Sequence, residues 1–281
     1  MLRQRVITAL VLVALLLAAL SASSAWPFSV LTLALMAAGG WEWARLNQAP
    51  SGLDWALGGL VVAAGALALA VGWTHHVPAA LWWSGLALWV LGGAVALRGG
   101  PGAWPRVPRT LRLLMGVVVI WLAWLAVAQA RTISINFLLS VLCLVWMADV
   151  AAYFGGRAWG KAKLAPSISP GKSWAGVWTG IVGVQLLAVF WMWLDRRYGF
   201  DGASFYTRLQ AQLGWAGLAL ALVVMSALSV VGDLVESLVK RAAGAKDSSQ
   251  LLPGHGGVLD RVDALLPTLP AALALVAWGA R

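Results

Sequence analysis

Charge is scarce in this sequence, and cysteine is almost absent. Charged residues make up 11% of the 281 residues, whereas a soluble domain carries roughly 25%. The single cysteine, Cys143, excludes disulfides within the chain and metal sites built from several thiolates. Acidic residues are few, ten against twenty Lys and Arg, while hydrophobic residues reach 61%. This composition excludes a soluble domain and indicates an integral membrane protein.

Apolar runs long enough to cross a bilayer, which takes about 20 residues, recur along the whole chain. Nine are expected, at about 5–25, 27–45, 53–73, 78–97, 111–130, 133–155, 174–194, 214–240 and 262–280. We therefore predict an all-α, polytopic integral membrane protein with about nine transmembrane helices, in a single membrane domain over residues 1–281. The first run also resembles a signal peptide, but it is long enough to span, so an uncleaved helix is predicted.

The distribution of Lys and Arg predicts the orientation of these helices. With a cytoplasmic N-terminus, fifteen of the twenty fall on the cytoplasmic side, and the other side carries Arg131, Arg196, Arg197, Arg208 and Arg281. This is the positive-inside pattern of membrane proteins. It also accounts for the net charge of +10, so the charge indicates an anionic lipid surface and no nucleic-acid partner.

The two halves of the chain differ in kind. Residues 1–130 contain two acids, Glu42 and Asp54, and are expected to be mainly helical scaffold. Residues 131–281 contain three clusters of charged and polar residues and are expected to carry the chemistry. The topology predicted from Lys and Arg alone places all three clusters on the same cytoplasmic face, which indicates one site.

The first cluster is MADVAAYFGGRAWGKAKLAPSISPGKSWAG. Asp149 lies inside an apolar run, where an ionisable group is costly and usually functional. Asp149, Tyr153 and Gly156 are spaced i, i+4 and i+7, so they share one helix face. Ala152 and Gly155 are small enough to let another helix approach closely. The loop that follows adds candidates suited to phosphate oxygens: Ser169, Lys172 and Ser173.

The second cluster is VVGDLVESLVKRAAG, at the end of the eighth run. Its polar members occur at i, i+3, i+4, i+7 and i+8 and form one stripe: Asp233, Glu236, Ser237, Lys240 and Arg241. An ion pair between Glu236 and Lys240 accounts for Glu236. It does not account for Asp233, one turn deeper beside apolar sequence, and Asp233 is therefore a candidate site residue.

The third cluster is GAKDSSQLLPGHGGVLDRVDAL. Three glycines surround His255, in a loop whose backbone amides can point at phosphates. Asp260 and Asp263 can share one face of the following helix, and together with Asp233 they can hold a divalent ion such as Mg²⁺. Helix capping accounts for one carboxylate but hardly for the whole group: Lys246, Asp247, Ser248, His255, Asp260, Arg261 and Asp263.

Carboxylates, several cations and glycine loops at a membrane face are typical of phosphoryl or nucleotidyl transfer. Metal and cations neutralise charge there, and positioning does most of the rest.

The stretch SLVKRAAGAKDSSQLLPGHGGVLDRVD, from Ser237, resembles the signature of the phosphatidate cytidylyltransferases, also called CDP-diacylglycerol synthases. ADVAAYFGGRAWGK, SPGKSWAG and GDLVES resemble the segments that precede it in that family. These matches cover about the second half of the chain, while the first half agrees in hydropathy and helix count. Two positions depart from the family, Ala175 (often acidic or amide) and Ala264 (often serine), so no role is carried over to them.

The resemblance implies transfer of CMP from CTP to phosphatidic acid, with Mg²⁺ as cofactor. It implies a homodimer in the bacterial inner membrane, in contact with membrane lipids and with the active site facing the cytoplasm. Asp233 and Asp260 are implied as metal ligands, with Asp263 a third candidate, and Lys246 and His255 join these three as catalytic candidates. The candidate substrate-binding residues are Asp149, Tyr153, Ser169, Lys172, Ser173, Lys240, Arg241, Asp247, Ser248 and Arg261.

Two alternatives remain open at this point. A related lipid kinase or cytidylyltransferase would use the same chemistry on another lipid acceptor. A proton-coupled transporter would also place an acid such as Asp149 inside the membrane, although transporter sites lie near the midplane between repeats, and no internal repeat is apparent in the sequence.

Overall fold

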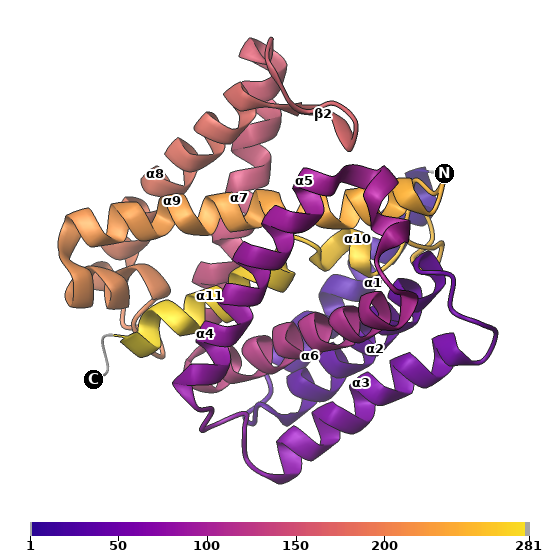
Figure 1. Ribbon diagram of the computed structural model, residues 1–281. Helices are drawn as coiled ribbons and strands as arrows, with labels where there is room; N and C mark the ends of the chain where they lie inside the picture. Colours follow the sequence, from indigo (N-terminus) through magenta and orange to yellow (C-terminus); the bar gives the residue numbers. More distant parts are fainter. Residues whose placement is uncertain (1, 279–281) are drawn as a thin grey trace.

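The computed structural model describes residues 2–278, and most of them lie in helices (Figure 1). The α-helices are α1 (Leu2–Leu20), α2 (Trp26–Leu46), α3 (Leu53–Ala70), α4 (Ala79–Ala87), α5 (Gly93–Ala103), α6 (Arg109–Ile133), α7 (Ile135–Trp159), α8 (Trp174–Arg197), α9 (Phe205–Ala242), α10 (Leu259–Val262) and α11 (Leu265–Trp278). A π-helical turn η1 (Leu88–Gly92) precedes α5, and a 3₁₀ turn η2 (Trp104–Arg106) follows it. One antiparallel hairpin, β1 (Lys163–Ala165) with β2 (Ser169–Ser173), joins α7 to α8. The prediction of an all-α protein is confirmed, with this hairpin as a small addition.

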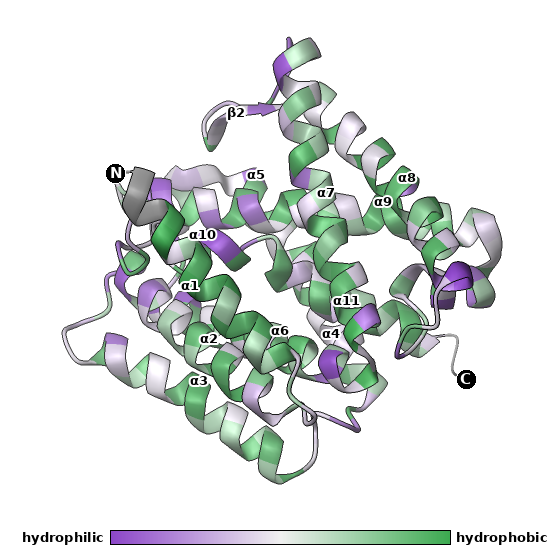
Figure 2. Cartoon of the chain, turned by 180° about the vertical axis from the view of Figure 1, so that it is seen from behind, coloured by the Kyte–Doolittle hydropathy of each residue, from purple (hydrophilic) through white to green (hydrophobic). Residues whose placement is uncertain are grey.

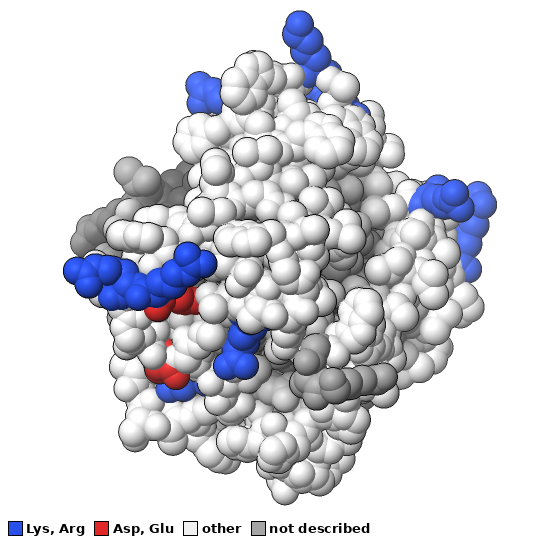
Figure 3. All heavy atoms as spheres, turned by 90° about the vertical axis from the view of Figure 1, so that its left-hand side faces the viewer, with Lys and Arg blue, Asp and Glu red and all other residues white. Residues whose placement is uncertain are grey.

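Seven segments of the described chain are long and apolar enough to cross a membrane. They are Leu53–Ala70, Ala79–Arg106, Arg109–Ile133, Ile135–Trp159, Trp174–Arg197, Phe205–Ala242 and Leu259–Trp278. These segments correspond to the last seven of the nine predicted runs. In Figure 2 the helices are hydrophobic over most of their length, and hydrophilic residues gather at the β1–β2 hairpin and around α10. Figure 3 shows the same contrast on one face, where Lys and Arg form a few small groups, acidic residues lie beside some of them, and most of the remaining surface is uncharged.

Two of the predicted segment limits are wrong, and both errors occur at glycines with positive φ. The fourth run was expected to end near residue 97, but α5 continues to Ala103, with a break at Gly100 (φ 66°). The eighth run was expected to begin near residue 214, but α9 begins at Phe205 and is kinked at Gly214 (φ 69°). Glycine reaches this region of backbone conformation without steric cost, so the helix axis can change direction there.

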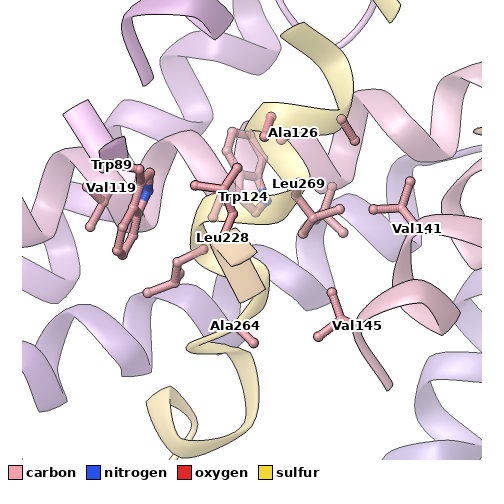
Figure 4. Packing of buried hydrophobic residues seen from close by; sticks show 14 of the residues in the cluster. Trp89, Val119, Trp124, Ala126, Val141, Val145, Leu228, Ala264 and Leu269 are labelled. Carbon is pink, nitrogen blue, oxygen red and sulfur yellow. The ribbon is translucent and has the colours of Figure 1, made fainter. Parts of the chain in front are cut away.

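The core surrounds α6, the most enclosed of the spanning helices, with 72% of its most apolar window buried. Figure 4 shows its Trp124 in a cluster with Leu228 of α9 and Leu269 of α11. The Trp124 indole also donates a hydrogen bond of 3.0 Å to the carbonyl oxygen of Ser29 in α2. The N-terminal and C-terminal helices are thus packed into one core. The side chains of Arg3 and Arg5 and the whole of Arg281, which entered the charge count, lie outside the described part.

Helices α7 and α8 pack backbone to backbone and carry the hairpin at their ends (Figure 1). A Cβ on Gly180 would lie 3.0 Å from the carbonyl oxygen of Ala148, and one on Gly155 would overlap Thr179. Small residues therefore set the distance between these helices, which confirms the packing role predicted for Gly155.

Candidate active site

A cavity of about 530 Å³ lies between α7, the hairpin, α8 and α9. Asp149, Tyr153 and Gly156 all line it, as their i, i+4, i+7 spacing predicted. Ser169 and Lys172 line it from the hairpin. The wall also contains apolar and small residues of the spanning helices: Ala148, Ala152, Val177, Gly180, Ile181 and Val230. The cavity therefore combines a polar end with an apolar wall.

Lys172 and Asp233 join the first predicted cluster to the second. The ammonium of Lys172 lies 2.6 Å from Oδ2 of Asp233, and the two side chains are 24% and 29% exposed. Ser237 donates a hydrogen bond of 3.3 Å to Oδ1 of the same carboxylate. Asp149 is close enough for its charge to interact with both Lys172 and Asp233. Since Asp233 also lines the cavity, this group of charges faces the open space.

Lys240 joins the second cluster to the third. Its ammonium lies 2.5 Å from Oε2 of Glu236 and 2.6 Å from Oδ1 of Asp260, which confirms the predicted ion pair within α9. Oδ2 of Asp260 accepts three more hydrogen bonds, from the backbone N–H (2.9 Å) and hydroxyl (2.9 Å) of Ser248 and from the N–H of Gly257 (2.8 Å). The structure thus brings the three distant segments together into one continuous polar region.

Glu42 of α2 belongs to this region and was missed at the sequence level. Its side chain is fully buried and accepts hydrogen bonds from residues more than 200 positions away, among them Ser248 and Leu259. An acid inside an apolar run was the available signal, and it is the same signal that selected Asp149. None of the three charged clusters lies near Glu42 in the sequence, so local sequence does not predict its contacts.

Several predicted residues have their polar atoms engaged in holding the backbone. The hydroxyl of Ser173 caps α8 by accepting the N–H of Gly176 at 3.2 Å. Arg241 donates to the carbonyl oxygen of Ile168 in the hairpin at 3.4 Å. Arg261 donates through Nε and Nη2 to the carbonyl oxygen of His255, at 3.0 and 2.5 Å.

Lys246 and Asp247 lie outside the cavity described above. They line a second, more open groove of about 760 Å³, together with Trp41 and Arg45 of α2. The guanidinium of Arg45 lies 4.7 Å from the centre of the Trp41 ring, in a cation–π arrangement. The structure therefore places Lys172 and Lys246 at two different openings.

The predicted magnesium ligands are only partly placed to meet one ion. Among residues 2–278, no three His, Cys, Asp or Glu side chains converge on a metal-sized site. Asp260 has its oxygens occupied by Lys240, Ser248 and Gly257. Asp233 faces the cavity and is close enough to Asp263 for their charges to interact. Mg²⁺ is usually held by one or two carboxylates plus water and substrate phosphates. Asp233 is the predicted ligand that lines the cavity, and its Oδ2 would have to exchange the ammonium of Lys172, at 2.6 Å, for the ion.

A bundle of spanning helices, with paired carboxylates and lysines gathered at one end beside a cavity, defines a membrane-embedded enzyme that acts on phosphate groups. The model of the cytidylyltransferase family matches residues 3–278. The chain therefore belongs to the cytidylyltransferase family, which confirms the resemblance found in its motifs.

Curated relatives with the name phosphatidate cytidylyltransferase are similar to this chain. The protein of Pseudomonas aeruginosa is 39% identical over 294 aligned positions, which cover the whole of both chains. The protein of Haemophilus influenzae is 47% identical over 133 residues, covering 47% of this chain and 43% of that protein. The protein of Staphylococcus epidermidis is 35% identical over 158 residues, covering 56% and 55%. The similarity to the first of these extends over the N-terminal half, where no sequence motif was recognised.

Proposed function

We propose that this protein transfers CMP from CTP to phosphatidate and releases CDP-diacylglycerol and pyrophosphate. The observation that carries the proposal is the continuous polar region from Lys172–Asp233 to Lys240–Asp260 beside a cavity with an apolar wall. Such a cavity suits a substrate with a charged phosphate and lipid chains. Full-length similarity to a phosphatidate cytidylyltransferase supports the same substrates.

The chemistry is a displacement at phosphorus. A phosphate oxygen of phosphatidate forms a bond to the α-phosphorus of CTP, while the bond from that phosphorus to the oxygen bridging it to the β-phosphorus breaks and pyrophosphate leaves. The attacking phosphate is already an anion at neutral pH, so no strong general base is required. The barrier is the approach of two anions, which fixed cations lower.

The residues of the site divide this task between them. Lys172, at the polar end of the cavity, would hold the phosphate of phosphatidate, with its acyl chains against Val177 and Ile181 of α8. Lys240 and Arg241 of α9 would face the triphosphate. Arg241 of α9 donates a hydrogen bond to the carbonyl oxygen of Ile168 in the hairpin. The hairpin would therefore hold the lipid phosphate, bound by Lys172, near α9.

Magnesium belongs to the proposal on chemical grounds. When bound, it would neutralise charge on the phosphates of CTP. Asp233 and Asp263 would hold it, with Asp233 exchanging Lys172 for the ion. Asp260, the other predicted ligand, could join them only by releasing Lys240. His255 and Lys246 remain candidates for positioning CTP from the signature loop.

The protein's proposed membrane arrangement has two more spans than the seven apolar segments of the described chain, and it includes an orientation. Nine spans, with α1 and α2 as the first two, would place the N-terminus and the active site in the cytoplasm and the protein in the bacterial inner membrane. The excess of Lys and Arg on that side supports this orientation. A homodimer is included because the family resemblance implies one.

The test is a transfer assay with purified protein in lipid-containing micelles. CTP labelled at the α-phosphate is supplied with phosphatidate, and label in the lipid phase is measured with Mg²⁺ omitted and then restored. We expect lipid labelling that depends on both phosphatidate and Mg²⁺. Labelling of a polyprenol or an isoprenoid ether lipid in preference to phosphatidate would identify a different acceptor, and no labelling of any lipid would contradict the proposal.

A further inference from the structure

Glu42 is a fully buried carboxylate in the half of the chain expected to be scaffold. Oε1 accepts hydrogen bonds from the hydroxyl of Ser249 (2.6 Å) and the N–H of Val258 (2.9 Å). Oε2 accepts from the hydroxyl of Ser248 (3.1 Å) and the N–H of Leu259 (2.8 Å). Each oxygen therefore accepts one hydrogen bond from a serine hydroxyl and one from a backbone N–H. Three of these donors lie in the loop of residues 243–258, and the N–H of Leu259 lies at the start of α10.

This arrangement requires a carboxylate. An isolated charge is very costly to bury, and four hydrogen bonds to the charged form offset that cost. A glutamine at this position would turn an NH₂ group toward the N–H of either Val258 or Leu259, whichever way the amide is oriented. Backbone amides cannot reverse their polarity, so one buried donor would always face another.

Ser248 connects Glu42 to the active-site region. Its hydroxyl lies 3.1 Å from Oε2 of Glu42 and 2.9 Å from Oδ2 of Asp260, so its single hydrogen can be donated to either carboxylate. Asp260 in turn holds the ammonium of Lys240 at 2.6 Å. Ser249 binds the same carboxylate of Glu42, but its other hydrogen bond is to the N–H of Leu251 within the loop. Only one of the two serines therefore links α2 to Lys240.

We propose that Glu42 is a positioning residue for CMP transfer, which holds Asp260 through Ser248 and thereby fixes Lys240 beside the reacting phosphates. The proposal rests on the function proposed above. It assigns the N-terminal half a part in the reaction: a lysine on α9 is aligned by an acid on α2.

The neighbouring serines provide a matched pair of variants for testing this. Ser248→Ala removes the link to Asp260, while Ser249→Ala removes a hydrogen bond from the same carboxylate without touching that link. We expect Ser248→Ala to lower kcat/KM for CTP by about 10- to 100-fold, because small displacements of a reacting group have effects of this size. KM for phosphatidate should stay within twofold of wild type in both variants, since its proposed cavity is lined by α7, α8 and the hairpin. Ser249→Ala should keep its kcat/KM for CTP within about threefold.

Glu42→Gln extends the test, with Asp54→Asn, the other acid of the first half, as its control. Glu42→Gln should lose CTP turnover at least as strongly as Ser248→Ala, and Glu42→Asp should recover part of it. Equal kinetics for the two serine variants would overturn the proposal, as would losses that follow melting temperature and affect both substrates alike. If Glu42→Gln does not fold, the serine pair still decides. A wild-type protein that labels no lipid would overturn the proposed function, whereas an active wild type with equivalent serine variants would overturn this inference alone.

Discussion

At the scale of single residues, Asp260 is held by an arrangement that only a carboxylate satisfies. Oδ1 faces the ammonium of Lys240, and Oδ2 faces two backbone N–H groups and the hydroxyl of Ser248. An asparagine would present its NH₂ group either to the ammonium or to the backbone amides, and both are donors. The negative charge that balances Lys240 would also be lost.

We therefore predict that Asp260→Asn abolishes CMP transfer while the protein is still made and inserted. The expected loss is at least about 100-fold, the size seen when a group that stabilises developing charge is removed. Lipid labelling from CTP in membranes, normalised to the amount of protein, measures it, with Asp54→Asn as the control. Near-normal labelling would remove Asp260 from the site.

Lys172 supports a second prediction at this scale. Lys172→Met keeps the length of the side chain but removes the ammonium that lies 2.6 Å from Asp233. We expect CMP transfer to fall about 100-fold, mainly because the phosphate of phosphatidate loses the ammonium proposed to bind it. Lys163→Met is the matched control, since Lys163 is exposed on the neighbouring strand β1. A fall of the same size in both variants would indicate a general effect of charge at the membrane surface.

The sequence predicted which segments the structure brings together, but not all of the contacts between them. Asp149 and Asp233 are predicted because an ionisable group in or beside apolar sequence is costly, and Lys240 is predicted from its i, i+4 spacing to Glu236. That Lys172 meets Asp233, and not another acid, depends on the hairpin between α7 and α8, which was expected to be a loop. Glu42 makes its contacts across more than 200 residues of chain, and no local pattern records such a distance.

At the scale of helices, the close packing of α7 on α8 sets the width of the cavity. A Cβ on Gly155 would overlap Thr179, whereas one on Gly59, in α3, would meet nothing within 4 Å. Both glycines lie inside helices, so alanine gains about the same helix propensity at each, up to about 1 kcal/mol. The difference between the two variants therefore isolates the packing.

We predict that Gly155→Ala is less stable than Gly59→Ala by about 1–3 kcal/mol, the usual cost of overpacking. Thermal unfolding in detergent, followed by loss of tertiary signal, provides the comparison. CTP turnover should also fall in Gly155→Ala, because the two walls of the cavity would separate. Equal melting temperatures would show that α7 and α8 accommodate the added methyl group without loss of stability.

The helices could be predicted from hydropathy for two reasons. Inside a bilayer a segment must satisfy its backbone hydrogen bonds internally, as a helix does. It must also be apolar over about 20 residues to cross the hydrocarbon core. Their breaks could not be predicted in the same way. Gly100 and Gly214 adopt positive φ, while Gly180 and most other glycines of these runs do not. Gly100 precedes Pro101, which disfavours a helical conformation in the residue before it, so this break has a local signal. Gly214 has no such neighbour, and hydropathy alone does not distinguish it from the glycines that continue a helix.

At the scale of the whole molecule, the contacts cross the boundary drawn at residue 130. Trp124 packs with Leu228 and Leu269 in the core (Figure 4), and Glu42 binds the loop that carries the family signature. A fragment that lacked the first half would lose the acid that holds this loop. The scaffold and the site are thus parts of one folded unit.

Orientation in the membrane is the property of the whole molecule that decides where the site faces. Helix α8 has 24 residues, which gives a length of about 36 Å at 1.5 Å per residue, more than the hydrocarbon core of about 30 Å. We therefore expect the hairpin before it and Gly199 after it to lie on opposite sides of the membrane. Both Lys163 and Gly199 are exposed.

Since Cys143 is the one native thiol, Cys143→Ser provides a background for single reporters. In spheroplasts, we expect an impermeant maleimide to label Gly199→Cys at once, and Lys163→Cys only after lysis. This follows from a cytoplasmic hairpin, where CTP and Mg²⁺ are available to Lys172 and Asp233. The reverse pattern would place these residues outside the cell, away from CTP, and the proposed direction of the reaction could not then hold. Labelling of both reporters in intact spheroplasts would instead mean that α8 does not span.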